Sequence, residues 1–166
     1  APSFTGSPFD GSIGADARDV RLTMRDVVLM RVGGGLTATG SGGGIFAHNP
    51  TADILGPTLN FDRGYQWVDA QAGATRFRFV NTHLEAFSSD LALAQAKELL
   101  ANAPATDRST VFVCDCNSDP LNDSVKPIDH VPHKAAYDLI TTAGGFTDEW
   151  LEHAPAAEGW TPGLSD

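Results

Sequence analysis

The feature that most constrains the fold is a strand–helix–strand order in the middle of the chain. Residues 75–83 and 110–116 are rich in strand-forming residues, and residues 89–102 begin with Ser and Asp and carry leucines at helical spacing. This order is that of a βαβ crossover. If both strands lie in one sheet they are parallel, and their carboxyl ends finish at the same edge. The sequence therefore predicts an α/β fold.

Side-chain alternation along these two strands places polar groups at that edge. One face of each strand is apolar until its carboxyl end, where it turns polar: Phe77, Phe79, Asn81 and His83 in the first strand, and Val111, Val113, Asp115 and Asn117 in the second. We expect His83, Asp115 and Asn117 to converge there. Asn and Asp also commonly end strands by bonding nearby backbone, so periodicity alone leaves a purely structural role open.

The reverse face of the second strand is apolar as well, and it includes both cysteines of the chain. We therefore expect this strand to be covered on both faces. Cys114 and Cys116 stand two apart in VFVCDCNSDP and would point to the same side of a strand. A disulfide at this spacing is geometrically poor, and a metal site would need further ligands, so buried free thiols are the favoured interpretation.

The flanking segments predict fewer regular elements. Residues 64–71 form a hairpin with the first strand, and a second helix spans about 133–143 before two glycines end it. Residues 19–32 predict one or two strands, and residues 1–17 predict a loop. The two glycine triplets at 33–35 and 42–44, which bracket a short segment, predict a flexible hairpin connection.

Composition narrows the functional classes. The chain has 166 residues, of which 42% are hydrophobic and 19% charged, as in a globular domain. Its formal net charge of −10 argues against a module that only binds nucleic acid, because phosphate neutralisation needs a basic face. No apolar run reaches the roughly 20 residues of a membrane helix, and the first residues do not resemble a signal peptide.

Four segments in order resemble motifs of the endonuclease/exonuclease/phosphatase superfamily. RFRFVNTHLEAF (76–87) resembles its strand ending in Asn-Thr-His-Leu, and VFVCDCNSDP (111–120) resembles its Gly-Asp-Phe-Asn-Ser-x-Pro motif. RLTMRDVVLMR (21–31) and AYDLITTAGGFTDEW (136–150) agree further. The resemblance covers nearly all of the chain. It implies a four-layer α/β sandwich, in which two packed mixed sheets are flanked by helices, and hydrolysis of a phosphodiester or phosphomonoester.

The resemblance also implies roles for individual residues. His83 would donate to a phosphoryl oxygen, Asp115 would orient or deprotonate the attacking water or help to hold a metal, and Asn117, with Asn81, would bind the substrate. The implied cofactor is Mg²⁺ or Mn²⁺, which prefer oxygen ligands.

The sequence departs from the family pattern in several places. Cys114 and Cys116 stand where the family has Gly and Phe, which we expect to affect packing alone. A preceding strand with the metal-binding Glu and a following Asp-His segment do not occur. We therefore expect residues 1–166 to be an internal piece of one domain, with exposed apolar sheet surface and little activity by itself. A second chain or the absent segments would complete the fold.

The alternative is a non-catalytic scaffold or binding fragment of such a domain. For the enzyme, the implied partner is a phosphate-ester substrate, and the acidic charge favours small phosphodiesters, lipid head groups or inositol phosphates over nucleic acid. Neither a cytoplasmic nor a secreted location is indicated over the other. The segment PIDHVPH, which holds Asp129, His130 and His133, is interpreted as a loop and helix start rather than a metal site.

Overall fold

The computed structural model describes residues 4–5, 19–20, 25–31, 33–53, 58–104 and 107–154. The strands are β1 (Phe4–Thr5), β2 (Asp19–Val20), β3 (Leu36–Ile45), β4 (Thr51–Asp53), β5 (Thr58–Asn60), β6 (Gly64–Ala72), β7 (Thr75–His83) and β8 (Ser109–Asp115). The helices are α1 (Ser89–Asn102), α2 (Ala135–Thr141) and α3 (Glu149–His153). β1 pairs with β2 and β4 with β5, each antiparallel.

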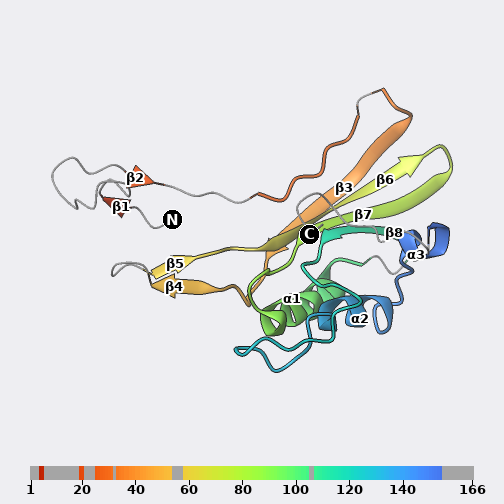
Figure 1. The fold of residues 1–166 in the computed structure, drawn as a ribbon. Helices are drawn as coiled ribbons and strands as arrows, with labels where there is room; N and C mark the ends of the chain where they lie inside the picture. Colours follow the sequence, from red (N-terminus) through yellow and green to blue (C-terminus); the bar gives the residue numbers. More distant parts are fainter. Residues whose placement is uncertain are drawn as a thin grey trace.

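A mixed sheet with the order β3-β6-β7-β8 dominates the fold (Figure 1). β3, β6 and β7 are antiparallel neighbours, and β7 and β8 are parallel because α1 returns the chain between them. The predicted βαβ unit is thereby confirmed. α1 and α2 lie together on one face of the sheet (Figure 1). Their buried side chains and those of the sheet and its flanking loops form the core: Phe46, Val80, Leu84, Ala92, Ala96, Leu99, Ala103, Ala136 and Ile140.

Helix α1 begins where the sequence predicts, and its start is fixed by two caps. The Ser88 hydroxyl accepts a hydrogen bond from Leu91 N at 3.3 Å. Asp129, at 8% exposure, accepts from Ser88 Oγ at 2.7 Å and from Ser89 N at 2.8 Å. Asp129 therefore anchors the 118–133 loop to the helix start, and these bonds hold the pKa of its carboxyl below the ordinary value despite burial.

The glycine-rich segment is a strand and not a flexible connection, so that prediction was wrong. β3 runs for ten residues against β6. Its glycines are needed because the neighbouring side chains of β6 lie across it: a Cβ on Gly42 would come within 2.5 Å of Trp67 Cζ2. The glycine content suggested a flexible segment, whereas these glycines are present because the strand packs closely against an aromatic ring.

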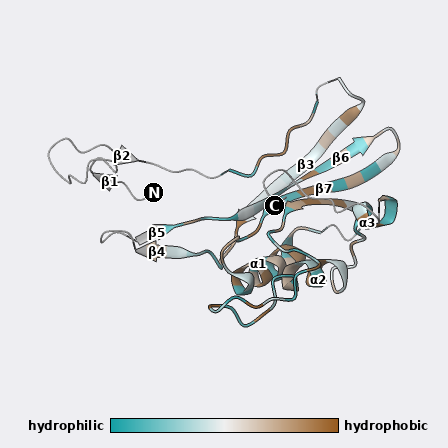
Figure 2. Cartoon of the chain, viewed as in Figure 1, coloured by the Kyte–Doolittle hydropathy of each residue, from teal (hydrophilic) through white to brown (hydrophobic). Residues whose placement is uncertain are grey.

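One face of β8 is open in the described part of the chain, which corrects the expectation that both faces are covered. Phe112 packs against the core, but Val111 and Val113 on the other face are 45% and 46% exposed. Figure 2 shows the hydrophobic residues that run along β8 and α1. The expected exposure of apolar sheet surface is confirmed. Among the described residues, no second sheet packs on this face of β8.

Residues 25–31 have no ladder partner in the described ranges, so the strand predicted over 19–32 is confirmed at β2 alone. The predicted loop at 1–17 lies outside the described residues except at β1. α2 is shorter than predicted and is followed by Gly145, whose φ of 67° ends the helical path. Among the described residues, no helix has the length and apolarity to cross a membrane.

Candidate functional site at the carboxyl ends of two parallel strands

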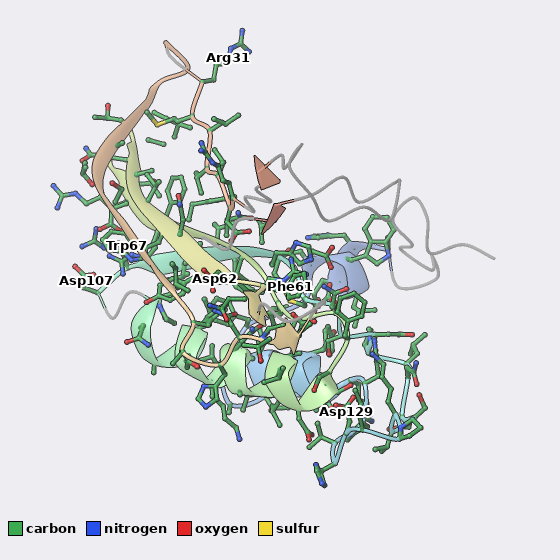
Figure 3. All side chains as sticks on the ribbon, turned by 90° about the vertical axis from the view of Figure 1, so that its left-hand side faces the viewer. Arg31, Phe61, Asp62, Trp67, Asp107 and Asp129 are labelled. Atoms are coloured by element: carbon green, nitrogen blue, oxygen red, sulfur yellow. A yellow bond between two sulfur atoms is a disulfide. The ribbon has the colours of Figure 1, made fainter. Side chains whose placement is uncertain are left out.

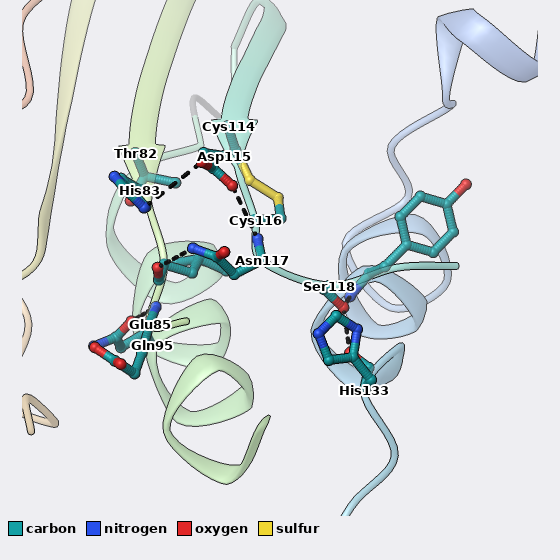
Figure 4. Close-up of a disulfide and its surroundings, with 12 residues drawn as sticks. Thr82, His83, Glu85, Gln95, Cys114, Asp115, Cys116, Asn117, Ser118 and His133 are labelled. Atoms are coloured by element: carbon teal, nitrogen blue, oxygen red, sulfur yellow. Dashed lines mark hydrogen bonds and ion pairs between the residues drawn. A yellow bond between two sulfur atoms is a disulfide. The ribbon is translucent and has the colours of Figure 1, made fainter. Parts of the chain in front are cut away.

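His83 and Asp115 are the last residues of their strands and lie opposite each other in the parallel ladder. His83 Nε2 lies 3.7 Å from Asp115 Oδ2 (Figure 4). The two side chains remain accessible, with 37% of His83 and 66% of Asp115 exposed. The predicted convergence of these two residues is confirmed, and it follows from the parallel register of β7 and β8.

Asn117 follows in a turn that is fixed by backbone contacts. Its φ of 45° lies in the left-handed region, which Asn tolerates better than most residues. Its Nδ2 donates to Leu84 O at 2.9 Å, and its backbone N donates to Asp115 Oδ1 at 3.3 Å. Leu84 N in turn donates to Asp115 O at 2.9 Å. Asn117 thus joins the loop after β7 to the loop after β8, directly beside His83.

Asn81 lies on the same face of β7 as His83, opposite Val113 of β8 and Gln66 of β6. Its side chain is half-buried on the open face of the sheet. It stands one pleat away from His83, about 7 Å along the strand. The structure therefore places Asn81 beside the site but one step further from the strand ends than His83 and Asp115.

Cys114 and Cys116 are joined in a disulfide, which corrects the expectation of free thiols (Figure 4). Extended residues two apart are too widely spaced for easy bridging, but β8 ends at Asp115 and the chain turns at once. The Cα atoms of the two cysteines are therefore 5.1 Å apart, inside the usual span of disulfides of about 4.4–6.8 Å. The turn that carries Asp115 and Asn117 is closed by a covalent bond.

Asp26 and Arg63 also belong to this region, although neither was predicted from the sequence as a site residue. Burial raises the pKa of the half-buried Asp26 above its ordinary value of 3.8, while the nearby charges of His83 and Arg63 oppose that rise. Asp26 therefore lies within electrostatic reach of both His83 and Arg63. The RDVVLMR segment (25–31) resembles a family motif, but only the fold shows that Asp26 is the residue of this segment that approaches His83.

Arg63 is 8% exposed and has a weakly satisfied guanidinium. Its Nε lies 3.7 Å from Oε2 of Glu85, which is itself 1% exposed. Within the described part of the chain, Arg63 Nε and Nη1 have no hydrogen-bond partner. Buried guanidinium donors are normally paired, so this group is a candidate for contacting an anion or ordered water. No local pattern around Arg63 could have revealed this.

Gln95 of α1 holds Glu85 in place. Gln95 Oε1 accepts from Glu85 N at 2.8 Å, and its Nε2 donates to His48 O at 2.7 Å. Glu85 Oε1 accepts from Phe87 N at 2.9 Å. Hydrogen bonds therefore join the loop after β7, which follows His83 directly, to α1 and to the segment after β3.

The residues present supply few metal ligands. The described ranges contain no group of three or more His, Cys, Asp or Glu side chains able to hold a metal ion. Asp115 offers carboxylate oxygens of the kind that Mg²⁺ prefers, but it is one ligand. What the site does offer is an imidazole beside an accessible carboxylate, which suits proton transfer and hydrogen bonding to an anionic substrate.

No protein-family model matches the sequence, and no curated protein matches it significantly. The structure resembles that of an endonuclease/exonuclease/phosphatase family protein from Bacteroides thetaiotaomicron, with a TM-score of 0.50 and 14% identity over 70% of this chain and 39% of that one.

Two further solved structures are also similar. The human Nocturnin catalytic domain with bound sulfate anion gives a TM-score of 0.48, with 14% identity over 74% of this chain and 42% of that one. A mannosyl-6-phosphatase from Bacteroides thetaiotaomicron gives 0.46, with 14% identity over 70% and 41%. The chain spans about two fifths of the length of these structures. The described residues thus have the fold of part of an endonuclease/exonuclease/phosphatase family protein.

Proposed function

We propose that these residues form part of a phosphoesterase domain that hydrolyses a phosphodiester or phosphomonoester. The observation that carries the proposal is the meeting of His83 and Asp115 at one sheet edge, beside the fixed turn of Asn117. The fold of the chain and its ordered motifs support it. We further propose that the complete domain is a four-layer sandwich, in which a second sheet covers the open face that carries Val111 and Val113.

In the proposed reaction, water attacks phosphorus in line with the departing oxygen. His83 Nε2 donates a hydrogen bond to a non-bridging phosphoryl oxygen and stabilises the charge that develops there. Asp115 accepts from the attacking water or takes its proton, which its exposed oxygens allow. Asn81 and Asn117 line the path of the substrate, although Asn117 uses one amide proton to hold Leu84 O.

Mg²⁺, or Mn²⁺ in its place, is the proposed cofactor. Bound to phosphoryl oxygens, such an ion would neutralise negative charge on the substrate. Of the described residues, Asp115 is the one proposed as a ligand, and it does not suffice for tight binding. We therefore assign no catalytic step to the ion and expect the 166-residue chain to bind it weakly. Calorimetric titration with Mg²⁺ and Zn²⁺ measures this directly.

The substrate class follows from charge. With a net charge of −10, the chain lacks the excess of basic residues that a long polyanion would require. We propose a small phosphodiester, a lipid head group or an inositol phosphate ahead of duplex DNA. The second candidate is a non-catalytic scaffold, which is favoured by the small number of metal ligands among the described residues.

The test is hydrolysis of bis-(p-nitrophenyl) phosphate and p-nitrophenyl phosphate with Mg²⁺ or Mn²⁺. The 166-residue chain is compared with longer products of the same gene that extend it on both sides. We expect hydrolysis by an extended chain, a rate lower by several orders of magnitude for the short chain, and a loss of about 100-fold or more in kcat on His83→Ala. His153→Ala is the matched control, because this exposed histidine pairs with Glu149 away from the site.

Three results would decide against parts of the proposal. An extended chain that hydrolyses neither ester with either metal ion would favour the scaffold. Full activity after His83→Ala would move the chemistry away from the β7–β8 edge. A 166-residue chain that is a stable monomer with full metal-dependent activity would show that no further segments are required.

A further inference from the structure

The Cys114–Cys116 disulfide has an unusual position, because it brackets the residue that would act on water. Asp115 is the single residue between the two bonded cysteines. Its carboxylate faces His83, its backbone oxygen accepts from Leu84 N, and its Oδ1 accepts from Asn117 N. Each of these contacts depends on the path that the chain takes from Cys114 to Asn117. The turn that the disulfide closes is therefore the same turn that positions Asp115 and Asn117.

The two sulfur atoms belong to differently held parts of the molecule. Cys114 is in β8, where the ladder with Thr82 of β7 fixes its backbone. Cys116 follows the strand and packs against the buried core cluster. Both side chains are half-buried, so they are partly accessible to a small thiol. Two unbonded sulfurs cannot stay at bonding distance and must separate to van der Waals contact. With both ends held, the separation must be taken up in the short segment between them, which begins at Asp115, the last residue of β8 paired with β7.

We propose that the Cys114–Cys116 pair is a redox-controlled positioning device for Asp115 and Asn117. In the disulfide form the turn is closed and Asp115 faces His83, and in the dithiol form the turn relaxes and this alignment loosens. The proposal concerns the regulation of the hydrolytic site and so rests on the proposed function. Cys114 and Cys116 are positioning residues here, since neither would touch the reacting atoms.

The redox step balances with a dithiol as the reductant. One thiolate of the reductant attacks a protein sulfur, the protein S–S bond breaks, and the other protein sulfur leaves as a thiolate that takes up a proton. The second thiolate of the reductant then attacks the mixed disulfide and releases the remaining protein thiol. Two electrons and two protons pass to the protein, and the reductant becomes a disulfide. A low-molecular-weight disulfide such as oxidised glutathione reverses the exchange.

The first measurement establishes the redox state. The full 166-residue chain is treated with iodoacetamide under denaturing conditions, before and after incubation with dithiothreitol, and its intact mass is determined. We expect no alkylation before reduction and addition of two carbamidomethyl groups after it. Two alkylated cysteines in a chain that has been kept with oxidised glutathione would overturn the proposal, because the disulfide would then not form.

The second measurement reads the turn without any hydrolysis. Hydrogen–deuterium exchange is followed at the amides of Leu84 and Asn117, in the disulfide and dithiol forms. We expect reduction to speed exchange at both amides by about tenfold, with less than about twofold change at Ala96 and Leu99 of α1. The double variant Cys114→Ser/Cys116→Ser should exchange like the reduced chain and should not respond to dithiothreitol.

Unchanged exchange at Leu84 and Asn117 on reduction would refute the positioning role. Equal acceleration in α1 would refute it as well, because the disulfide would then stabilise the whole fold rather than this turn. Both measurements are independent of phosphoester cleavage. A redox-responsive turn in a protein that cleaves no ester would leave the redox response of the turn standing and remove both the proposed function and the control of it. An active extended chain with an unresponsive turn would instead support the proposed function and refute this inference.

Discussion

Arg78 and His83 lie on the same strand, yet Arg78 is closely paired with its carboxylate partner and His83 is not. Arg78 donates from Nε to Asp69 Oδ1 at 2.7 Å and from Nη2 to Asp69 Oδ2 at 3.0 Å, and its Nη1 donates to Ala103 O at 3.1 Å. Its guanidinium carbon lies 3.8 Å from the centre of the Trp67 ring. Figure 3 labels Trp67, the residue of β6 on whose ring the Arg78 guanidinium lies.

At the end of β7 the contacts are longer and less complete. His83 and Asp115 are 3.7 Å apart, as are Arg63 and Glu85, and two nitrogens of Arg63 lack hydrogen-bond partners in the described part of the chain. A bidentate, stacked pair stabilises a fold, whereas loosely paired charges at a strand end are available to a ligand. The strand β7 therefore carries a structural ion cluster around Arg78 and a candidate site around His83.

The largest effect is expected for the ion cluster around Arg78. Arg78→Met leaves Asp69, which is 9% exposed, without its bidentate partner. We expect the free energy of unfolding to fall by about 2 kcal/mol, less than for a buried charge left with no partner, because Arg108 Nη1 still lies 3.3 Å from Asp69 Oδ2. Urea denaturation measures it, and Arg76→Met on the same strand is the control because Arg76 is exposed. Equal losses from both variants would contradict the assignment of the Arg78–Asp69 pair as a stabilising contact.

Acid should weaken the same cluster. The hydrogen bonds from Arg78 hold the pKa of Asp69 below its ordinary value of 3.8. Protonation is therefore harder in the folded state, so this stabilisation is fully present above that value and is lost as the pH falls through the lower folded pKa. We expect the thermal midpoint to drop from about pH 4 downwards, and to drop less in Arg78→Met. Parallel acid profiles in the two proteins would contradict this.

At the candidate site, the stability contributed by Asp26 should depend on pH in the opposite direction to that contributed by Asp69. Burial raises its pKa above 3.8, so the folded state holds the proton more tightly than the unfolded state. Stability then falls as the pH rises through that window, and the loss persists at neutral pH. We expect Asp26→Asn to raise the unfolding free energy by about 0.5 kcal/mol at neutral pH and to have no effect well below pH 3.8. Asp62→Asn, at an exposed position, is the control.

The smallest expected change in stability comes from Asp115. Its side chain is 66% exposed, and its carboxylate makes long contacts. We expect Asp115→Asn to alter the free energy of unfolding by no more than about 0.5 kcal/mol, as for most surface substitutions. Chemical denaturation provides the measurement. A loss near that of Arg78→Met would mean that Asp115 is a structural residue and not a candidate for catalysis.

Periodicity predicted the elements that position the site. The limits of β6, β7, α1 and β8 agree with the sequence to within about one residue, because each has a strong pattern and clear punctuation. The meeting of His83 and Asp115 followed from the parallel crossover. Asp26 and Arg63 could not be predicted in this way, since the approach of Asp26 to His83 and to Arg63 depends on how distant segments pack. The roles of all of these residues in catalysis stay predictions.

Two local features misled the sequence analysis for different reasons. The glycines of β3 suggested flexibility, but their cause is the ring of Trp67 on the neighbouring strand. The spacing of Cys114 and Cys116 argued against a bridge because both were assigned to one extended strand. β8 ends between them, and the turn brings their Cα atoms close enough. A boundary shifted by one residue decided the outcome, and boundaries are the least certain part of such predictions.

The packing of Gly42 against Trp67 has a practical consequence for dividing the chain. A glycine-rich stretch is a usual place to cut a protein or to insert a tag. A break within Leu36–Ile45 would instead strip β6 of a hydrogen-bonded neighbour and uncover the indole ring. The turn at Gly33–Gly35 is the better junction, because Gly33 and Gly35 have positive φ and, among the described residues, no atom beyond their chain neighbours lies within 4 Å of where their Cβ atoms would be.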